Sequence, residues 1–157
     1  LTMRIILITG LLTFFIDQLS KYYVVFYLDL QNVLSINVIP PFLNFRMGWN
    51  TGINFGMLNQ LFKSTEIFLI VLALLISVAL VWWAKIKQFN ILGFTSIGLI
   101  VGGAIGNAYD RFLYGAVADF INMSCCGIEN PFVFNIADIA IFIGVFSLFF
   151  INDDKKT

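Results

Sequence analysis

Hydrophobic residues in this chain gather in four long stretches, and polar residues collect between them. A bilayer core is about 30 Å thick, so a helix needs roughly 20 apolar residues to cross it. Each stretch is about that long, which predicts four transmembrane helices. The first stretch is too long for a signal-peptide core and no small-residue cleavage site follows, so we expect it to be retained. The expected bounds are Arg4–Tyr27, Glu66–Ala84, Ile91–Leu113 and Asn135–Ile151.

Two longer polar segments, Leu28–Thr65 and Tyr114–Phe134, connect these stretches on one side of the membrane. They contain the proline and glycine residues typical of connecting segments, where function usually concentrates. Within the first, the run Phe42–Arg46 predicts short strands at the membrane interface. No internal repeat is visible, so residues 1–157 are expected to form a single domain.

Composition agrees with a membrane location. Of the 157 residues, 60% are hydrophobic and 11% are charged, and the mean hydropathy is +0.93. Soluble domains have roughly 25% charged residues, and a water-soluble fold of this length could not hide so much apolar surface. The net charge is zero with no basic tract, which argues against nucleic acid as a partner. The chain has no histidine, and we expect neither a metal nor another cofactor.

Lysine and arginine residues flanking the expected helices indicate the orientation. With four spans, Arg4, Lys85, Lys87, Lys155 and Lys156 all lie on one side. Cytoplasmic loops carry an excess of Lys and Arg, so we expect both termini in the cytoplasm. The two polar segments then lie at the outer face.

Ionisable residues within the expected helices need a reason, because each costs about 2.5 to 3.5 kcal/mol at mid-helix on insertion scales. Asp17 and Lys21 are four residues apart, so they share a helix face and can pair. They form either a structural ion pair or part of a site. A hydrolase that used Ser20 with Lys21 is a weaker alternative, because adjacent helical residues point in different directions. The other such residues are Asp110, Arg111 and Asp138.

The third expected helix carries two stripes with a four-residue period. One consists of Gly98, Gly102 and Gly106, which is the small-residue pattern that lets membrane helices approach closely. On an adjacent face, Asn107 and Arg111 bring an amide and a guanidinium together near the outer end. We expect these polar groups to face the interior of the bundle.

Two carboxylates fall near the outer ends of helices. Asp119 follows the third helix, and Asp138 lies about one turn inside the fourth if Asn135 caps it. Two carboxyl groups at one interface can share a proton and divide acid and base roles, because close like charges cannot both ionise. Alternatively, Asp119 is a solvated loop residue and Asp138 is a carboxylate favoured by the helix dipole. Spacing alone leaves both interpretations open.

Four sequence blocks, in the same order, resemble those of the lipoprotein signal peptidases, the type II signal peptidases of bacteria. The blocks are Asp17–Lys21, Asn50–Gly56, Gly102–Arg111 with Val117–Ile121, and Phe134–Asp138. With the four spans they cover nearly the whole chain, and the last two are highly specific. One departure is Ile53-Asn54, where the family usually has two alanines, which affects the expected shape of the pocket.

The resemblance implies a four-transmembrane-helix bundle with a small extracytoplasmic β-cradle. Its catalytic pair corresponds to Asp119 and Asp138. The residues that hold the substrate or support the pair correspond to Asn50, Gly52, Asn107, Arg111 and Asn135, with Asp17 and Lys21 as a supporting couple. The adjacent Cys125 and Cys126 lie outside the pattern and are interpreted as loop residues, with a vicinal disulfide as the alternative.

The activity implied by the resemblance is removal of the signal peptide from a prolipoprotein, by cleavage before a cysteine that carries a diacylglyceryl group. One carboxylate would act as general base on water, and the other, protonated, would polarise the carbonyl and protonate the leaving amine. The implied partners are lipid-modified prolipoproteins and membrane lipids, and we expect a monomer in the bacterial cytoplasmic membrane.

Two other classes of protein compete with this interpretation. A proton-coupled transporter or channel would also place aspartates in the membrane, but it predicts a polar stripe across the whole bilayer. The second expected helix is apolar throughout, and the cytoplasmic halves of the third and fourth carry no charge. A structural subunit would leave the polar blocks of the two outer segments without a purpose.

Overall fold

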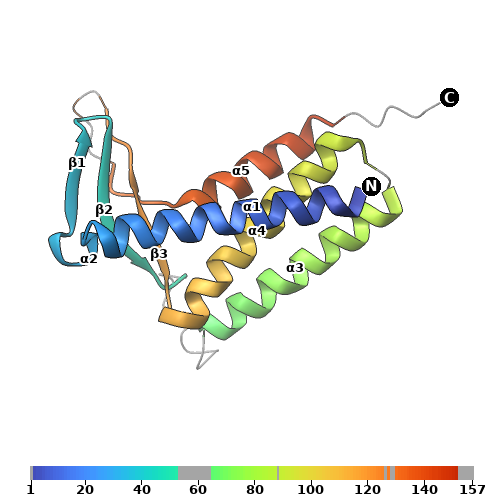
Figure 1. Ribbon diagram of the computed structural model, residues 1–157, viewed down its shortest axis with the longest axis horizontal. Helices are drawn as coiled ribbons and strands as arrows, with labels where there is room; N and C mark the ends of the chain where they lie inside the picture. Colours follow the sequence, from blue (N-terminus) through green and yellow to red (C-terminus); the bar gives the residue numbers. More distant parts are fainter. Residues whose placement is uncertain (1, 53–64, 88, 126, 128–129, 152–157) are drawn as a thin grey trace.

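The computed structural model describes residues 2–52, 65–87, 89–125, 127 and 130–151, and it is mostly helical with a small sheet at one end (Figure 1). Helices and strands follow in the order α1 (Thr2–Lys21), the π-helix η1 (Tyr22–Tyr27), α2 (Leu30–Val33), β1 (Ser35–Ile39), β2 (Leu43–Asn50), α3 (Thr65–Lys87), α4 (Ile91–Tyr114), β3 (Val117–Asn122) and α5 (Ile136–Phe149). The predicted residues Ile53-Asn54, Cys126, Lys155 and Lys156 lie outside the described residues.

Among the described residues, three helical segments are long and apolar enough to cross a membrane. They are Met3–Tyr27, Thr65–Lys87 and Ile91–Tyr114. The second ends at Lys87, three residues past its predicted end at Ala84. Its last turn therefore contains Lys85 and Lys87, and positive charge at this end of a helix is favoured by the helix dipole. The third ends where Gly115 adopts a positive φ of 73°, a conformation in which glycine is strongly preferred.

The fourth expected helix is shorter than predicted. Asn135 is the N-cap of α5, and the 14 helical residues run from Ile136 to Phe149, with Phe150 as the C-cap. At 1.5 Å per residue this helix is about 21 Å long, which is less than the bilayer core.

The central helix of the bundle is α4, which contacts α1, α3 and α5. The glycine stripe lies against α1: a side chain at Gly98 would collide with Thr9, and one at Gly102 would collide with the backbone of Gly10. The predicted role of the stripe in close helix packing is therefore confirmed for these two positions. On its other side, α4 packs against α5.

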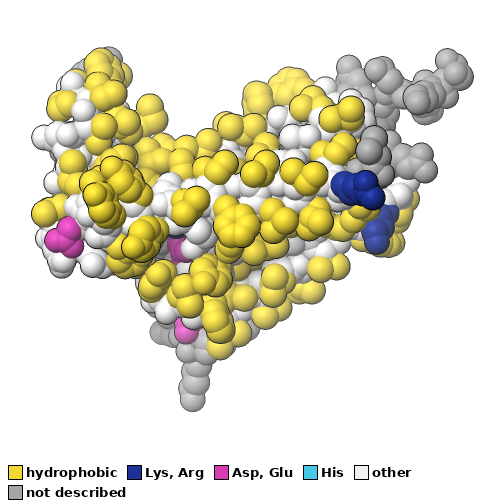
Figure 2. Space-filling view, viewed as in Figure 1, with side chains coloured by type: hydrophobic (Ala, Val, Ile, Leu, Met, Phe, Trp, Pro, Cys, Tyr) yellow, Lys and Arg dark blue, Asp and Glu magenta, His cyan; other side chains and the backbone are white. Residues whose placement is uncertain are grey.

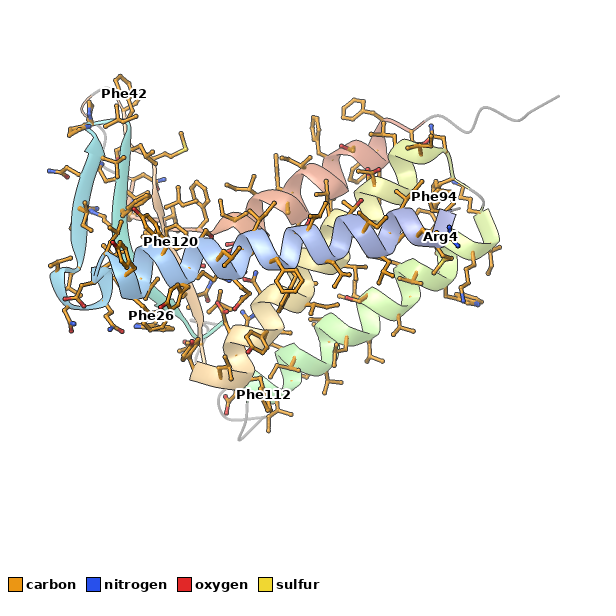
Figure 3. All side chains as sticks on the ribbon, in the orientation of Figure 1. Arg4, Phe26, Phe42, Phe94, Phe112 and Phe120 are labelled. Carbon is orange, nitrogen blue, oxygen red and sulfur yellow. The ribbon has the colours of Figure 1, made fainter. Side chains whose placement is uncertain are left out.

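A three-stranded antiparallel sheet in the order β1-β2-β3 lies at the end of the bundle opposite the start of α1 (Figure 1). The predicted strand Phe42–Arg46 falls largely within β2, whereas β3 was not predicted. The hydrophobic core at the sheet end of the molecule contains Phe120, and Phe26 packs against it. Both side chains lie near the sheet end of α1 (Figure 3). All six residues of β3 are buried, so it lacks the alternating pattern of a half-exposed strand.

Charged and apolar side chains separate along the molecule. Figure 2 shows hydrophobic side chains over the middle of the visible face and Lys and Arg side chains at the end where α1 begins. Acidic side chains appear on the other half of this face. Most of the large apolar side chains of α3 are exposed, as expected for a helix that faces lipid.

Candidate active site

Asp119 is buried on β3, with only 2% of its surface exposed. Its Oδ2 accepts a hydrogen bond of 3.0 Å from Asn50 Nδ2, and its Oδ1 accepts one of 2.6 Å from Asn135 Nδ2. Strand pairing explains this position, because Asp119 lies opposite Gly48 in β2, two residues from Asn50. The interpretation of Asp119 as a solvated loop residue is therefore wrong.

Asp138 is in the first turn of α5 and forms a capping box with Asn135. The backbone N–H of Asp138 donates to Asn135 Oδ1 at 2.9 Å, and the backbone N–H of Asn135 donates to Asp138 Oδ2 at 3.2 Å. This arrangement satisfies two backbone donors that a helix start otherwise leaves free. It also fixes one carboxylate oxygen of Asp138 relative to Asn135.

Two amide side chains connect the carboxylates. Asn107 Nδ2 donates to Asp138 Oδ1 at 2.9 Å, and Asn135 Nδ2 donates to Asn107 Oδ1 at 3.1 Å. The same Asn135 amide group donates to Asp119. Asp119 and Asp138 are thus joined through Asn135 directly and through Asn135 with Asn107.

A buried ion cluster, which consists of Asp17, Lys21 and Asp110, lies next to this network. Lys21 Nζ is 2.7 Å from Asp17 Oδ2, as the spacing of four residues predicted, and 2.8 Å from Asp110 Oδ2. Lys21 also donates to Asn107 Oδ1 at 3.2 Å. Ser20 Oγ instead donates to the carbonyl oxygen of Asp17, which gives no support to a Ser-Lys hydrolase.

Arg111 and Gly52 border the carboxylates on another side. Arg111 Nη1 donates to the carbonyl oxygen of Asn107 at 3.3 Å, while its buried Nε has no hydrogen-bond partner among the described residues. Gly52 has a φ of 102°, and its N–H donates to Asn50 Oδ1. A side chain at Gly52 would collide with Leu69 and lie beside Arg111, so glycine keeps this region open.

A cavity of about 250 Å³ opens next to Asp119. It is lined by residues of β2 and the segment after it, and by the segment before α5: Gly48, Trp49, Asn50, Thr51, Gly52, Asp119, Pro131, Phe132 and Val133. The space lies directly beside the carboxylate of Asp119.

Burial is the largest cause of the raised pKa of Asp119, and the nearby charge of Asp138 acts in the same direction, so that the pKa lies at about 6. Hydrogen bonds from Asn50 and Asn135, together with the charge of Lys21, oppose this rise. A carboxyl group with such a pKa exchanges protons near neutral pH, as a general acid or base requires.

The structure brings together all nine residues predicted for the site. Sequence reasoning missed the cavity-lining residues Gly48, Trp49, Thr51, Pro131, Phe132 and Val133, and it gave Asp110 no place in the site. The high cost of an ionisable group in a membrane helix singled out Asp110, but not its partners. Of the other six, Thr51 lies within the family block Asn50–Gly56, and no sequence signal marked the remaining five.

These features define a helical membrane protein with linked, partly buried carboxylates beside an open cavity. A profile of the signal peptidase II family matches residues 9–152, and the chain belongs to this family. The lipoprotein signal peptidase of Rhodopseudomonas palustris strain CGA009 is 35% identical over 150 residues, which cover 94% of this chain and 90% of that protein. The lipoprotein signal peptidase of Pelagibacter ubique is 38% identical over 154 residues, covering 96% and 90%.

Solved structures of bacterial membrane enzymes, determined by the in meso method, share the fold. One has a TM-score of 0.77 and 32% identity, with coverage of 97% of this chain and 94% of that one. Another has a TM-score of 0.71 and 32% identity, with coverage of 91% and 84%.

Proposed function

We propose that this protein is an aspartyl endopeptidase that removes signal peptides from prolipoproteins, with Asp119 and Asp138 as its catalytic residues. The observation that carries the proposal is that both carboxylates accept hydrogen bonds from Asn135, one from its side chain and one from its backbone. A single residue thereby fixes both carboxylates relative to each other. Membership of the signal peptidase II family supports the substrate class.

The proposed reaction is hydrolysis of one peptide bond by the singly protonated pair. The ionised carboxylate takes a proton from water, whose oxygen forms a bond to the scissile carbonyl carbon. The protonated carboxyl donates a hydrogen bond to the carbonyl oxygen and then gives a proton to the leaving nitrogen as the C–N bond breaks. The products are the free signal peptide and a lipoprotein with a new amino terminus at its lipid-modified cysteine.

We assign substrate binding to the cavity beside Asp119 and to Arg111. The guanidinium stays charged at any relevant pH, so it cannot act as the acid or base. Its buried Nε lacks a partner among the described residues, and a buried donor of this kind is costly until it is satisfied. A substrate backbone carbonyl would supply the missing acceptor. The diacylglyceryl group would hold the scissile bond at the bilayer surface.

An alternative role as a proton-coupled transporter fits the geometry less well. At the end of the bundle opposite the sheet, the described residues include a buried apolar cluster that consists of Ile6, Ala84, Phe94 and Ile97. A proton path would need polar groups there. A site that opens at one end suits an enzyme.

We also propose that α5 belongs to a fourth crossing, that both termini are cytoplasmic and that the site faces outward in the bacterial cytoplasmic membrane. The Lys and Arg side chains near the start of α1 support this orientation (Figure 2). We further propose that the chain works as a single domain and a monomer, since each residue assigned to the site comes from one chain.

The topology can be tested with a reporter enzyme fused after Thr157. The reporter should lie in the cytoplasm, and reporter activity outside the cytoplasm would contradict this topology.

The substrate class can be tested with purified enzyme and two forms of one precursor. We expect cleavage before the cysteine when it carries a diacylglyceryl group and no cleavage of the unlipidated form, because the lipid places the scissile bond at the depth of the carboxylates. Mass spectrometry of the products identifies the cleaved bond. Equal cleavage of both forms would contradict the proposed specificity.

The pH dependence of kcat/KM should follow the titration of the pair. Because the pKa of Asp119 is about 6 and the active pair carries one proton, kcat/KM should fall as the pH rises through about 6. Asn50→Ala removes a hydrogen bond that lowers this pKa, so the fall should move to higher pH, by on the order of one unit. A movement to lower pH would contradict this assignment.

In contrast to Asn50→Ala, Arg111→Lys should change kcat/KM without changing its pH dependence. Lysine keeps the positive charge but loses the planar fork of donors, so kcat/KM should fall, on the order of tenfold, while its pH dependence stays in place. Normal kcat and KM would show that Arg111 serves only to neutralise nearby carboxylates. A shifted pH dependence would show that it tunes the pair directly.

A further inference from the structure

The ion cluster of Asp17, Lys21 and Asp110 contacts the backbone immediately before each proposed catalytic residue. Asp110 Oδ2 accepts a hydrogen bond of 3.2 Å from the N–H of Ala118, which directly precedes Asp119. Asp17 Oδ1 accepts one of 2.9 Å from the N–H of Ala137, which directly precedes Asp138. The two contacts therefore have the same form on two different elements, β3 and α5.

Lys21 holds the two supporting carboxylates together. Its ammonium lies 2.7 Å from Asp17 and 2.8 Å from Asp110, and it is only 3% exposed. Its third hydrogen bond goes to Asn107 Oδ1. Because the ammonium of Lys21 binds the amide oxygen of Asn107, the NH₂ group of Asn107 points away from Lys21. That NH₂ group donates to Asp138.

Gln18 completes the surroundings of Asp110. Its Nε2 donates to Asp110 Oδ1 at 2.9 Å and lies 3.1 Å from Asp17 Oδ2. Both oxygens of Asp110 are thus engaged by donors, and its side chain is 1% exposed. Such complete satisfaction holds a buried carboxylate in one orientation, whereas an unsatisfied charge would be strongly destabilising.

We propose that Asp110 is a positioning residue for Asp119, as Asp17 is for Asp138, and that Lys21 fixes the distance between these two supports. This inference rests on the proposed function, since it takes Asp119 and Asp138 to be the catalytic pair. Two carboxylates on separate elements share a proton only at a short and constant separation. The ion cluster supplies that constraint from the side of the membrane helices, because Asp17 and Lys21 come from α1 and Asp110 comes from α4.

The test compares kcat and KM for Asp110→Ala and Asp110→Asn on a lipidated precursor. Asp110→Ala removes the acceptor for the Ala118 N–H, so kcat should fall about 10- to 100-fold, the range expected when reacting groups are misplaced by about an ångström. KM should stay within about twofold, because the cavity is not altered. Asp110→Asn keeps an acceptor oxygen at the same reach and should recover part of the loss.

A merely stabilising role predicts a different result. In that case Asp110→Ala would lower the melting temperature in detergent but leave kcat per folded enzyme unchanged, and this outcome would overturn the inference. Asp29→Asn is the matched control, because Asp29 is an exposed carboxylate outside the site whose side chain contacts Asn32. Its kcat should equal that of the wild type.

If Asp110→Ala does not fold, Gln18→Leu tests the same support with a smaller change. It removes one donor to Asp110, so kcat should fall severalfold with KM unchanged, and an unaltered kcat would overturn the inference. Failure of the proposed function is distinguishable from failure of this inference. Turnover by Asp119→Asn or Asp138→Asn would contradict the function, whereas inactivity of both with a normal kcat for folded Asp110→Ala would contradict the positioning role alone.

Discussion

Replacement of either Asp119 or Asp138 by asparagine should abolish cleavage of a lipidated precursor. Asparagine keeps the volume and one acceptor oxygen of aspartate, but it cannot exchange a proton. We expect each single variant to lose on the order of 10³-fold or more in kcat, since proton transfer is needed at both the water and the leaving nitrogen. The double variant should lose little more, because the two residues act as one unit.

The fold should survive both substitutions. Asp119→Asn keeps one oxygen that can accept from Asn135, and Asp138→Asn still offers one oxygen to its neighbours. Thermal unfolding in detergent checks this expectation, with Asp29→Asn as a control for the loss of a carboxylate elsewhere. More than a few percent of wild-type turnover in either folded single variant would contradict the paired-carboxylate mechanism.

Sequence reasoning located the long helices because their signal is local. Ile91 was placed at the start of the third helix, where Asn90 is the N-cap and its side chain accepts from the N–H of Gly93. The predicted end at Leu113 missed the observed one by a single residue. Hydrophobic length and capping residues both act within a few positions of the chain, so a single sequence records them.

The environment of Asp119 could not be predicted in the same way. Its burial depends on the pairing of β3 with β2 and on the bridge between Ile121 and Phe134. These contacts join segments far apart in the sequence, and a strand buried on both faces shows no alternation. The spacing of Asp119 and Asp138 was therefore compatible with two separate residues as well as with a site.

The ion cluster shows a second limit. The cost of a charge in a membrane helix marked Asp17, Lys21 and Asp110 as residues that need partners, and the first two were paired correctly from their spacing. Their other partners include the backbone N–H groups of Ala118 and Ala137. A backbone donor has no side-chain signature, so only the structure shows which backbone groups these carboxylates hold.

Asn135→Asp should lose activity while keeping the helix start intact. Asp caps helices about as well as Asn, so the oxygen that accepts from the Asp138 N–H is preserved. The amide that donates to Asp119 and Asn107 is replaced by a carboxylate. A third negative charge would then lie against Asp119, which raises the pKa of that residue further.

We expect Asn135→Asp to lower kcat/KM on the order of 10²-fold at pH 7, because the pair loses the amide that fixes its spacing. Asn135→Ala is the matched variant, since it removes the cap as well as the amide and should also lower the melting temperature. Asn135→Asp with near-normal activity, beside an impaired Asn135→Ala, would show that Asn135 acts only as a cap. A large loss of activity in folded Asn135→Asp is the expected result, because it separates the amide that links the carboxylates from the oxygen that starts the helix.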